Sequence, residues 1–342
     1  MTYVTADELR SHLARFEERR AHYEWQSKNA AGRLPRHEVW RHSYLADPYL
    51  IGAPADRVAA RWCDIFINAT ELGSDGKLGL LPFQTTDEFL QKFTHLIEEY
   101  AVRGGVPNDA VGKARTPLLR YFENGDPIAL KMFDGYIPPT SPFLVKYGRR
   151  EFLGPMFRSG KIRISPAAFY NDVKHNAAVR DDEISRTFFI PTYRERLEGK
   201  DHLDFQGHRI RFGEDDIIHP VVVEDYFLFS LCDHIYYRLP TDFGADAALV
   251  LRDPIRFTQR IISAFLSRWS EWEPMSGPVT YYDPYRDYTK FKIPEMAKHF
   301  GYAYQREVRI VLRSKRRILT TLQPEFLTIG GMEDYADLVS AD

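Results

Sequence analysis

The run from residue 304 to residue 313 constrains the fold more than any other part of the sequence, because apolar and charged side chains alternate along it. In a β-strand, successive side chains point to opposite faces of the sheet. Alternation therefore places Val308, Ile310 and Leu312 together on one face. We predict a strand over residues 304–313 whose apolar face packs into a core.

The opposite face of this predicted strand is charged and holds Glu307 close to Arg309 and Arg313. A carboxylate beside cations stays ionised, since opposite charges nearby favour its charged form. Such a group suits the stabilisation of positive charge in a reacting partner better than it suits proton donation. Two interpretations are open at this point: a solvated face with ordinary ion pairs, or one side of a ligand-binding cleft.

Length and proline placement divide the chain into two predicted domains. At 342 residues the chain exceeds the size at which one hydrophobic core usually stops growing. The pattern changes near the paired prolines Pro138 and Pro139, which stop helices and stiffen a connection. We therefore predict a helical domain over residues 1–135 and an α+β domain over residues 140–342.

The predicted helical domain opens with a capping signal, because Thr5 is followed three residues later by Glu8. Apolar residues at helical spacing continue from there to about residue 33. The same spacing predicts further helices at about residues 54–71, 85–102 and 107–123. The first part of the chain is therefore expected to be a bundle of helices.

Beyond the proline pair, short apolar runs alternate with helical segments, which is typical of an α+β domain. The strand-like runs are residues 143–147, 161–165, 227–232, 247–251 and 279–282. Helices are expected at residues 150–159, at 253–268 and near 294–299. The predicted fold class is α+β, with a helical N-terminal region.

Composition argues against several classes of protein. The formal net charge of -2 gives no overall basic field of the kind that attracts nucleic acids or membranes. No apolar stretch reaches the roughly 20 residues that span a bilayer, and no signal-like N-terminus is present, so we expect a cytoplasmic protein. The basic run at residues 313–317 is a local exception, either a solvated turn or a phosphate-contacting patch.

Common catalytic and cofactor motifs are absent from the sequence. It contains no glycine-rich dinucleotide motif, no P-loop, no nucleophile elbow and no closely spaced histidine pair, so no metal site is expected. Its two cysteines, Cys63 and Cys232, lie far apart and suggest neither a disulfide framework nor a zinc site. We expect Cys232 to be a buried, inert thiol rather than a nucleophile.

Polar residues that could form a site gather in three segments. The first, residues 143–148, is a strand-like run that ends near Lys146 and Tyr147. The second, residues 161–172, passes from a strand through Ser165 to aromatic residues and an Asn-Asp pair. The third is the strand that carries Glu307. Each segment alone is also explained by strand-end polarity or turn chemistry.

In order and content these segments resemble the ADP-ribosyltransferase superfamily. More closely, they resemble a bacterial family of unknown function whose members carry a Lys-Tyr strand, a Leu-Arg-Phe-Ser-x-Pro-x-x-Phe-Asn-Asp segment, and a late Glu-x-Glu-x-Arg strand. Residues 229–232 and 242–247 are similar to further strands of that family, so the resemblance covers about residues 140–313. It implies an ADP-ribosyltransferase-like split β-sheet domain with NAD as co-substrate.

The resemblance also implies roles for individual residues. Glu307 would stabilise the cationic, oxocarbenium-like ribose formed as nicotinamide leaves, and Gln305 would position the acceptor. Lys146 and Tyr147 would anchor NAD from the first strand. The other residues implied in NAD binding are Arg163, Ser165, Phe169, Tyr170, Asn171, Asp172 and Arg309.

The chain departs from the superfamily pattern at two positions that bear on NAD binding. Lys146-Tyr147 stands where superfamily members have an arginine or a histidine, and Ser165-Pro166-Ala167 stands where many have Ser-Thr-Ser.

Three functions are considered on these grounds. The first is an NAD-dependent ADP-ribosyltransferase that modifies a macromolecule, protein or nucleic acid, as toxins, effectors and anti-phage factors of the superfamily do. The second is a non-catalytic nucleotide-sensing or partner-binding module on the same scaffold. The third, a metal-dependent hydrolase or nuclease, is disfavoured because the histidines are dispersed and no lysine follows Glu307 at the spacing such sites use.

Overall fold

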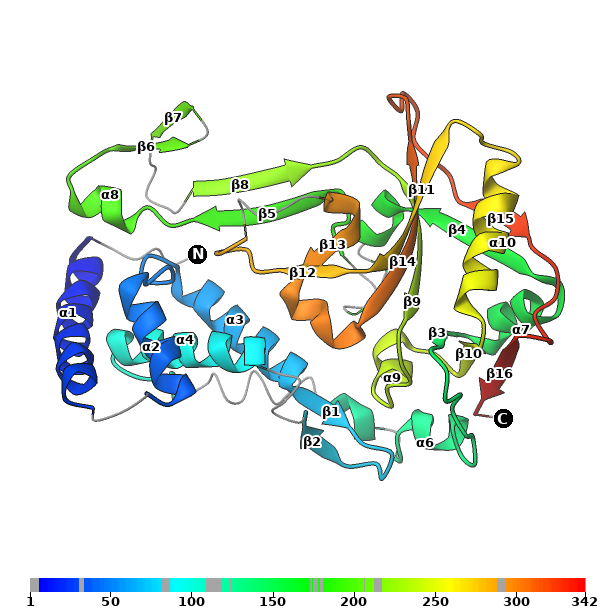
Figure 1. Ribbon diagram of the computed structural model, residues 1–342, viewed down its shortest axis with the longest axis horizontal. Helices are drawn as coiled ribbons and strands as arrows, with labels where there is room; N and C mark the ends of the chain where they lie inside the picture. Colours follow the sequence, from blue (N-terminus) through cyan, green and yellow to red (C-terminus); the bar gives the residue numbers. More distant parts are fainter. Residues whose placement is uncertain are drawn as a thin grey trace.

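The computed structural model describes residues 6–30, 34–81, 87–108, 119–123, 125–172, 174, 178, 181–205, 207–211, 217–287 and 293–341. It places the helices of the N-terminal region beside a domain built around an antiparallel sheet (Figure 1). The predicted α+β class and the helical N-terminal region are confirmed. Of the helices described, none is both long and apolar enough to cross a lipid bilayer.

The N-terminal region contains α1 (Ala6–Asn29), α2 (Arg36–Ala46), α3 (Ala55–Ala69) and α4 (Asp87–Arg103). Three of these helices match predicted segments, although the capping residue Thr5 lies outside the described residues. Helix α2 was not predicted, because it has no side-chain cap and its apolar residue Val39 faces solvent. Of the predicted helix at residues 107–123, the described part forms only the short turn η2 (Arg120–Phe122).

The helical region and the sheet domain share a buried interface. Phe300, which lies in the second half of the chain, packs in one cluster with Tyr44 and Trp62 of the helices. Arg61 on α3 donates two hydrogen bonds to the Asp283 carboxylate, at 2.6 and 3.0 Å, and both residues are buried. A buried ion pair is tolerated when its geometry is good. This two-point contact therefore fixes how α3 packs against the sheet domain.

Asp64 lies in the same interface and leads to a prediction about pH. A Cβ added at Gly301 in η5 (Phe300–Gln305) would lie 2.8 Å from an Asp64 carboxylate oxygen. Burial raises the pKa of Asp64 to about 7, against the opposing charge of Arg61. In the unfolded chain the pKa of an aspartate is about 3.9. The resulting contribution to stability is complete below about pH 4 and is lost as pH rises through about 7.

We therefore expect the free energy of unfolding to fall from about pH 4 to about pH 7, with Asp64 contributing at most about 1.4 kcal/mol per pH unit. The variant Asp64→Asn cannot titrate at this position and should remove that part of the slope. Urea denaturation of both proteins across this pH range measures the difference. Parallel pH profiles for the two proteins would contradict the raised pKa of Asp64.

The second part of the chain is organised around a sheet whose strands follow the order β11-β14-β9-β3-β10-β16, with antiparallel neighbours. These strands are β3 (Leu144–Gly148), β9 (Phe227–Cys232), β10 (Ala247–Leu251), β11 (Trp272–Pro278), β14 (Glu307–Ser314) and β16 (Ala336–Ser340). The strands predicted at residues 143–147, 227–232 and 247–251 are confirmed.

The sheet divides at β9. Cys232, the last residue of β9, pairs with Val145 of β3, whereas Leu228 near its start pairs with Ser165 of β4. The second branch consists of β4 (Lys161–Pro166) and β15 (Glu325–Thr328). Strand β14 pairs with β9 along the whole length of β9. Strands β3 and β4 therefore leave β9 at opposite ends, and only β3 lies beside the end that faces Glu307.

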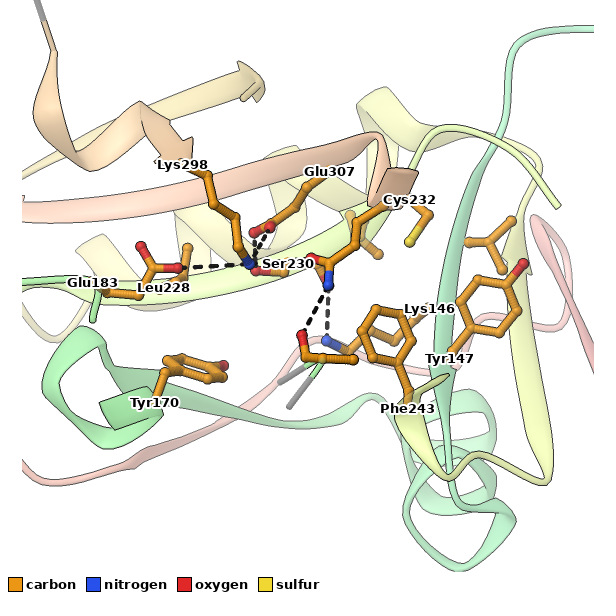
Figure 2. A pocket seen from close by; sticks show the side chains of 14 residues that line it. Lys146, Tyr147, Tyr170, Glu183, Leu228, Ser230, Cys232, Phe243, Lys298 and Glu307 are labelled. Atoms are coloured by element: carbon orange, nitrogen blue, oxygen red, sulfur yellow. Dashed lines mark hydrogen bonds and ion pairs between the residues drawn. The ribbon is translucent and has the colours of Figure 1, made fainter. Parts of the chain in front are cut away.

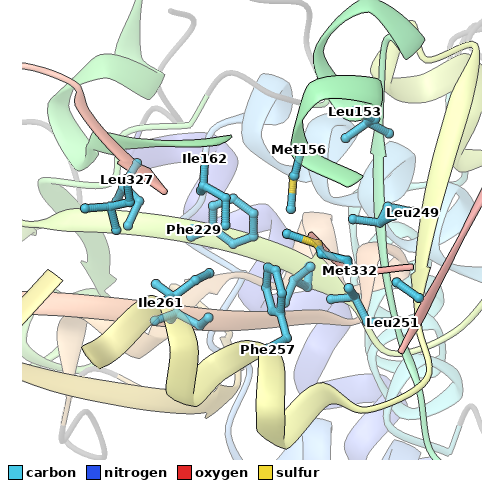
Figure 3. Close-up of a cluster of buried hydrophobic side chains, with 14 of the residues drawn as sticks. Leu153, Met156, Ile162, Phe229, Leu249, Leu251, Phe257, Ile261, Leu327 and Met332 are labelled. Atoms are coloured by element: carbon cyan, nitrogen blue, oxygen red, sulfur yellow. The ribbon is translucent and has the colours of Figure 1, made fainter. Parts of the chain in front are cut away.

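One face of the sheet packs against α7 (Arg150–Ser159) and α10 (Pro254–Leu266), both of which were predicted. Phe257 of α10 contacts Phe229 of β9, with ring centroids 5.8 Å apart, in the buried cluster shown in Figure 3. The predicted apolar face of β14 packs into the same cluster: Val308, Ile310 and Leu312. The core face of β14 is therefore confirmed.

Two predictions about the segment before β14 are wrong. The predicted strand at 304–313 begins only at Glu307, because residues 300–305 form η5 and Arg306 has a left-handed backbone, with φ 42° and ψ 55°. Asn68 of α3 accepts a hydrogen bond from the Tyr304 backbone N–H (2.6 Å), which satisfies that donor outside any sheet. The predicted helix near 294–299 is instead the turn η4 (Pro294–Met296) followed by β13 (Ala297–His299).

Strand β13 pairs in parallel with β12 (Thr280–Tyr282), and this pairing replaces helical hydrogen bonds. The predicted strand at 279–282 is confirmed to within one residue. The shorter elements nearby are η3 (Ala167–Asn171), α6 (Ile128–Met132) and α9 (Leu239–Phe243).

An arm built on two antiparallel strand pairs leaves the sheet domain and reaches over the helices (Figure 1). The arm consists of β5 (Ser185–Ile190), α8 (Tyr193–Leu197), β6 (His202–Phe205), β7 (His208–Arg211) and β8 (Ile217–Val222). Tyr193 at its far end packs with Phe16, Leu45 and Ile51 of the helical region. The residues just before β5 lie at the cavity described next, so the arm extends from the cavity to the helices.

Candidate functional site

A cavity of about 170 Å³ lies where β3, β9 and β14 meet (Figure 2). Its lining includes five residues predicted from the sequence to form the site: Lys146, Tyr147, Tyr170, Gln305 and Glu307. It also includes residues that were not predicted: Glu183, Ser230, Cys232, Phe243 and Lys298. The structure therefore brings together residues from all three sequence segments, separated by as many as about 160 positions.

Glu307 is held by three donors inside this cavity, and its exposed fraction is 4%. Strand register places Glu307 opposite Cys232 and Arg309 opposite Ser230, so these side chains share one face of the sheet. The Ser230 hydroxyl donates to Glu307 Oε1 (2.5 Å), as does Arg309 Nε (2.7 Å). Lys298 Nζ donates to Glu307 Oε2 (3.1 Å). Both carboxylate oxygens are therefore hydrogen-bonded from fixed positions.

These contacts determine the protonation state of Glu307. Burial alone would raise its pKa, but the charges of Arg309 and Lys298 more than offset burial and lower the pKa well below its ordinary range. The hydrogen bonds from Arg309 and Ser230 act in the same direction. Glu307 is therefore an anion at neutral pH, as its place in the sequence predicted.

The charged face of β14 is buried at Glu307 and Arg309, so its interpretation as a solvated face is wrong for these two residues. Arg309 has no exposed surface, and its guanidinium donates to both Glu183 oxygens at 2.6 and 2.8 Å. The expectation that Arg313 also holds Glu307 is wrong as well. Arg313 is half-exposed and pairs with Glu273 on β11 at 2.7 Å. Arg309 lies behind the carboxylate instead of lining the cavity.

Lys298 connects the two predicted catalytic residues. Its Nζ lies 3.1 Å from Gln305 Oε1 and 3.1 Å from Glu307 Oε2. The Gln305 amide then donates to the Ala178 carbonyl oxygen at 2.8 Å. Burial would lower the pKa of Lys298, but Glu307, Asp181 and Glu183 raise it instead. Lys298 is therefore a permanent cation that fixes the spacing of Gln305 and Glu307.

Lys146 lies on the opposite side of the cavity and has a different environment. Its Nζ donates to the Ser230 carbonyl oxygen (2.7 Å) and lies 4.6 Å from the centre of the Phe229 ring. It forms no ion pair with any carboxylate that the structure describes. Burial lowers its pKa. The neighbouring Tyr147 hydroxyl accepts a hydrogen bond from the Tyr236 backbone N–H (2.9 Å).

The other predicted NAD-binding residues lie outside the cavity lining. Arg163 is exposed and stacks 4.5 Å above the Phe169 ring, while Asn171 and Asp172 are exposed at the end of η3. Ser165 is buried where β4 pairs with β9. The physical reason is the division of the sheet, because β4 joins β9 at the end remote from Cys232. Among residues 161–172, Tyr170 is the one that lines the cavity at Glu307.

Two of the missed residues left a signal in the sequence. Ser230 is the single hydroxyl in an otherwise apolar strand, and alternation puts it on the face that carries Cys232. Glu183 lies two residues before the first strand of the arm. Lys298 left no such signal, because the segment that carries it was interpreted as a helix. Cys232 is buried, and burial raises the pKa of its thiol, in agreement with the inert thiol that was predicted.

Across the described ranges, no group of three or more histidine, cysteine, aspartate or glutamate side chains is arranged to hold a metal ion. Comparison with known protein families, curated proteins and solved structures found no match to this chain. The chemistry of the cavity is therefore the basis on which a function can be inferred.

Proposed function

We propose that the cavity binds the nicotinamide end of NAD and that the protein transfers ADP-ribose to a macromolecular acceptor. The observation that carries this proposal is a buried carboxylate, Glu307, which is kept ionised at the wall of a cavity by Arg309, Lys298 and Ser230. Cleavage of a glycosidic bond passes through a positively charged sugar. A preorganised anion stabilises such a state and is usually the largest catalytic contribution.

The proposed reaction breaks one bond to the ribose carbon and forms another. The bond between the ribose carbon and the nicotinamide nitrogen breaks, and its electrons leave with nicotinamide, which becomes neutral. Glu307 faces the positive charge that develops on the ribose. A nucleophile of the acceptor then bonds to the same carbon and releases its proton to solvent. Gln305, held by Lys298 and the Ala178 carbonyl, is placed beside Glu307 to orient the acceptor.

The arrangement of strands supports the proposed fold relationship. A split sheet with the anchor strand, a serine-bearing strand and the glutamate strand as neighbours is consistent with an ADP-ribosyltransferase-like domain; here those strands are β3, β9 and β14. Ser230, which contacts Glu307, then takes the role that the sequence interpretation gave to Ser165. The volume of about 170 Å³ fits one end of a dinucleotide, because whole-ligand pockets usually measure about 300–1,000 Å³.

Nicotinamide release from NAD by the purified protein, alone and with cellular extracts as acceptor, tests this function. Wild-type protein should release nicotinamide, and Glu307→Gln should lose at least about 100-fold in rate, because removal of one preorganised electrostatic contact typically costs that much. Ser230→Ala keeps every charge and should lose about tenfold. Absence of NAD turnover by the wild-type protein in all fractions would overturn the proposal.

Asp283→Asn is the matched control for these variants. Like Glu307, Asp283 is a buried carboxylate paired with an arginine, but it lies outside the cavity lining. Its replacement should lower stability without lowering the rate per folded molecule. Circular dichroism and thermal denaturation establish the folded fraction of each variant. An equal loss of activity in Asp283→Asn and Glu307→Gln would mean that the loss reflects folding and not catalysis.

One observation favours a second function, a nucleotide-binding module without catalysis. Glu307 is already neutralised by Lys298 and Arg309, so it can be a purely structural anion. In that case NAD would raise the melting temperature, since a ligand that binds only the folded state stabilises it. No nicotinamide would appear.

A further inference from the structure

A second and larger cavity, of about 650 Å³, lies between the helical region and the sheet domain. Its walls come from β1 (Thr70–Leu72), the start of α4, Tyr281 of β12 and the segment from Phe300 to Arg306. The volume falls within the range of about 300–1,000 Å³ that ligand pockets usually occupy. It is distinct from the cavity at Glu307, with which it shares no lining residue.

The second cavity is lined by aromatic rings together with two acidic and two basic side chains: Glu71, Glu88, Arg238 and Arg306. Aromatic rings contribute to its lining from α4, β12 and η5: Phe89, Tyr281, Phe300 and Tyr304. Cations of this chain already lie over three of these rings. Lys92 Nζ is 5.5 Å from the Phe300 ring centre and 6.0 Å from that of Phe89, and the Arg238 guanidinium is 4.0 Å from that of Tyr304. The rings are therefore placed to bind positive charge.

One charged lining residue is left without a partner. Arg238 pairs with Asp242 (2.9 Å), Arg306 pairs with Asp233 (2.8 Å), and Glu88 pairs with Lys92. The carboxylate of Glu71, in β1, has no hydrogen-bond or ion-pair partner within the part of the chain that the structure describes. A carboxylate in a partly apolar cavity is stabilised by a charged donor.

We propose that this second cavity binds a cationic side chain, arginine or lysine, of a protein partner. Glu71 would accept hydrogen bonds from the guanidinium or ammonium group, and the aromatic rings would contact its charge and its aliphatic stem. A carboxylate flanked by aromatic rings complements such a side chain in both charge and shape. It offers little to a phosphate, because Arg238 and Arg306 are already paired within the chain.

The cavity also lies close to the proposed catalytic residues. Residues 303–307 separate the two cavities: Gln305 and Glu307 line the first, whereas Tyr304 and Arg306 line the second. The Tyr281 hydroxyl, in the second cavity, accepts a hydrogen bond from the Glu307 backbone N–H (2.8 Å). A basic protein segment bound there would lie against the wall that carries Gln305. The identification of this basic segment as the ADP-ribose acceptor rests on the proposed function. The binding of the segment in the second cavity does not.

Calorimetric titration of the full chain without NAD tests the binding. The probes are N-acetyl-arginine methylamide, the uncharged isostere N-acetyl-citrulline methylamide, and adenosine. We expect saturable binding of the arginine probe, with the citrulline probe at least about tenfold weaker because it lacks the charge. Glu71→Gln should weaken arginine binding about tenfold, and Phe89→Leu should weaken it about two- to fivefold.

Glu18→Gln is the control, since Glu18 is exposed on α1 and lies outside the lining of either cavity. Equal affinity for the arginine and citrulline probes, tighter binding of adenosine, or binding unchanged by Glu71→Gln would each overturn the proposal. Because NAD is absent, these results are independent of nicotinamide release. Failure here with intact NAD turnover removes the cation site alone, and failure of NAD turnover leaves the titration unaffected.

Discussion

Replacement of Arg309 by methionine should lower the free energy of unfolding by about 3–5 kcal/mol, the range found when one partner of a buried ion pair is removed. Arg309 is fully buried, and its guanidinium donates to Glu183 and Glu307 as well as to the Glu295 carbonyl oxygen (3.0 Å). Methionine would fill a similar space without charge. Both carboxylates would then remain in the protein interior with one cation fewer, and Lys298 and Arg186 would be the cations that still pair with them.

Arg313→Met, four residues along the same face of β14, is the matched control. Arg313 is half-exposed and pairs with Glu273 at the surface, so its loss should cost less than about 1 kcal/mol. Urea denaturation of the two variants, read by circular dichroism, measures the difference. A similar loss of stability in both variants would show that burial of the Arg309 network contributes nothing beyond an ordinary surface pair.

Gly160→Ala should be among the most destabilising single-methyl substitutions in this protein. Gly160 ends α7 with a left-handed backbone, at φ 66°, and an added Cβ would lie 2.6 Å from the Gly330 nitrogen and would clash with the Gly330 carbonyl oxygen. The left-handed conformation alone costs an alanine about 1–2 kcal/mol. Relief of the clash requires movement of backbone, which typically adds about 1–3 kcal/mol.

Gly135→Ala separates these two costs. Gly135 has the same φ of 66°, but a Cβ added there would meet no atom within 4 Å. It should therefore show the conformational cost without the steric cost. Melting temperatures of the two variants, compared with that of the wild-type protein, give the difference. If Gly135→Ala is as destabilising as Gly160→Ala, the close approach of Gly160 to Gly330 is not what makes glycine necessary.

Local sequence patterns predicted the elements whose stability is local. Helix α3 follows apolar spacing, α7 ends at a glycine, and β9 is apolar except at Ser230, so each was predicted within a few residues. The segment before β14 was not, because distant residues determine it. Asn68 binds the Tyr304 backbone N–H, and β12 supplies the partner of β13. Contacts of this kind override local preference and leave no periodic signal.

The candidate site was predicted only in part, for the same reason. Alternation correctly paired Glu307 with Arg309 and predicted an ionised carboxylate. It could not show that Glu183 and Lys298 complete the arrangement, because Glu183 lies in the segment before β5 and Lys298 lies in β13. Nor could it show that β4 leaves β9 at the far end, which moves Ser165 away and leaves Ser230 beside Glu307.

The ion pairs around Arg309 have a consequence for ionic strength. Three carboxylates and three cations are paired there: Asp181, Glu183, Glu307, Arg186, Lys298 and Arg309. Their formal charges cancel, and five of the six side chains are less than 10% exposed. Dissolved salt screens surface pairs such as Arg313–Glu273 but screens buried pairs much less. The geometry that holds Glu307 should therefore be the same in dilute buffer and in concentrated salt.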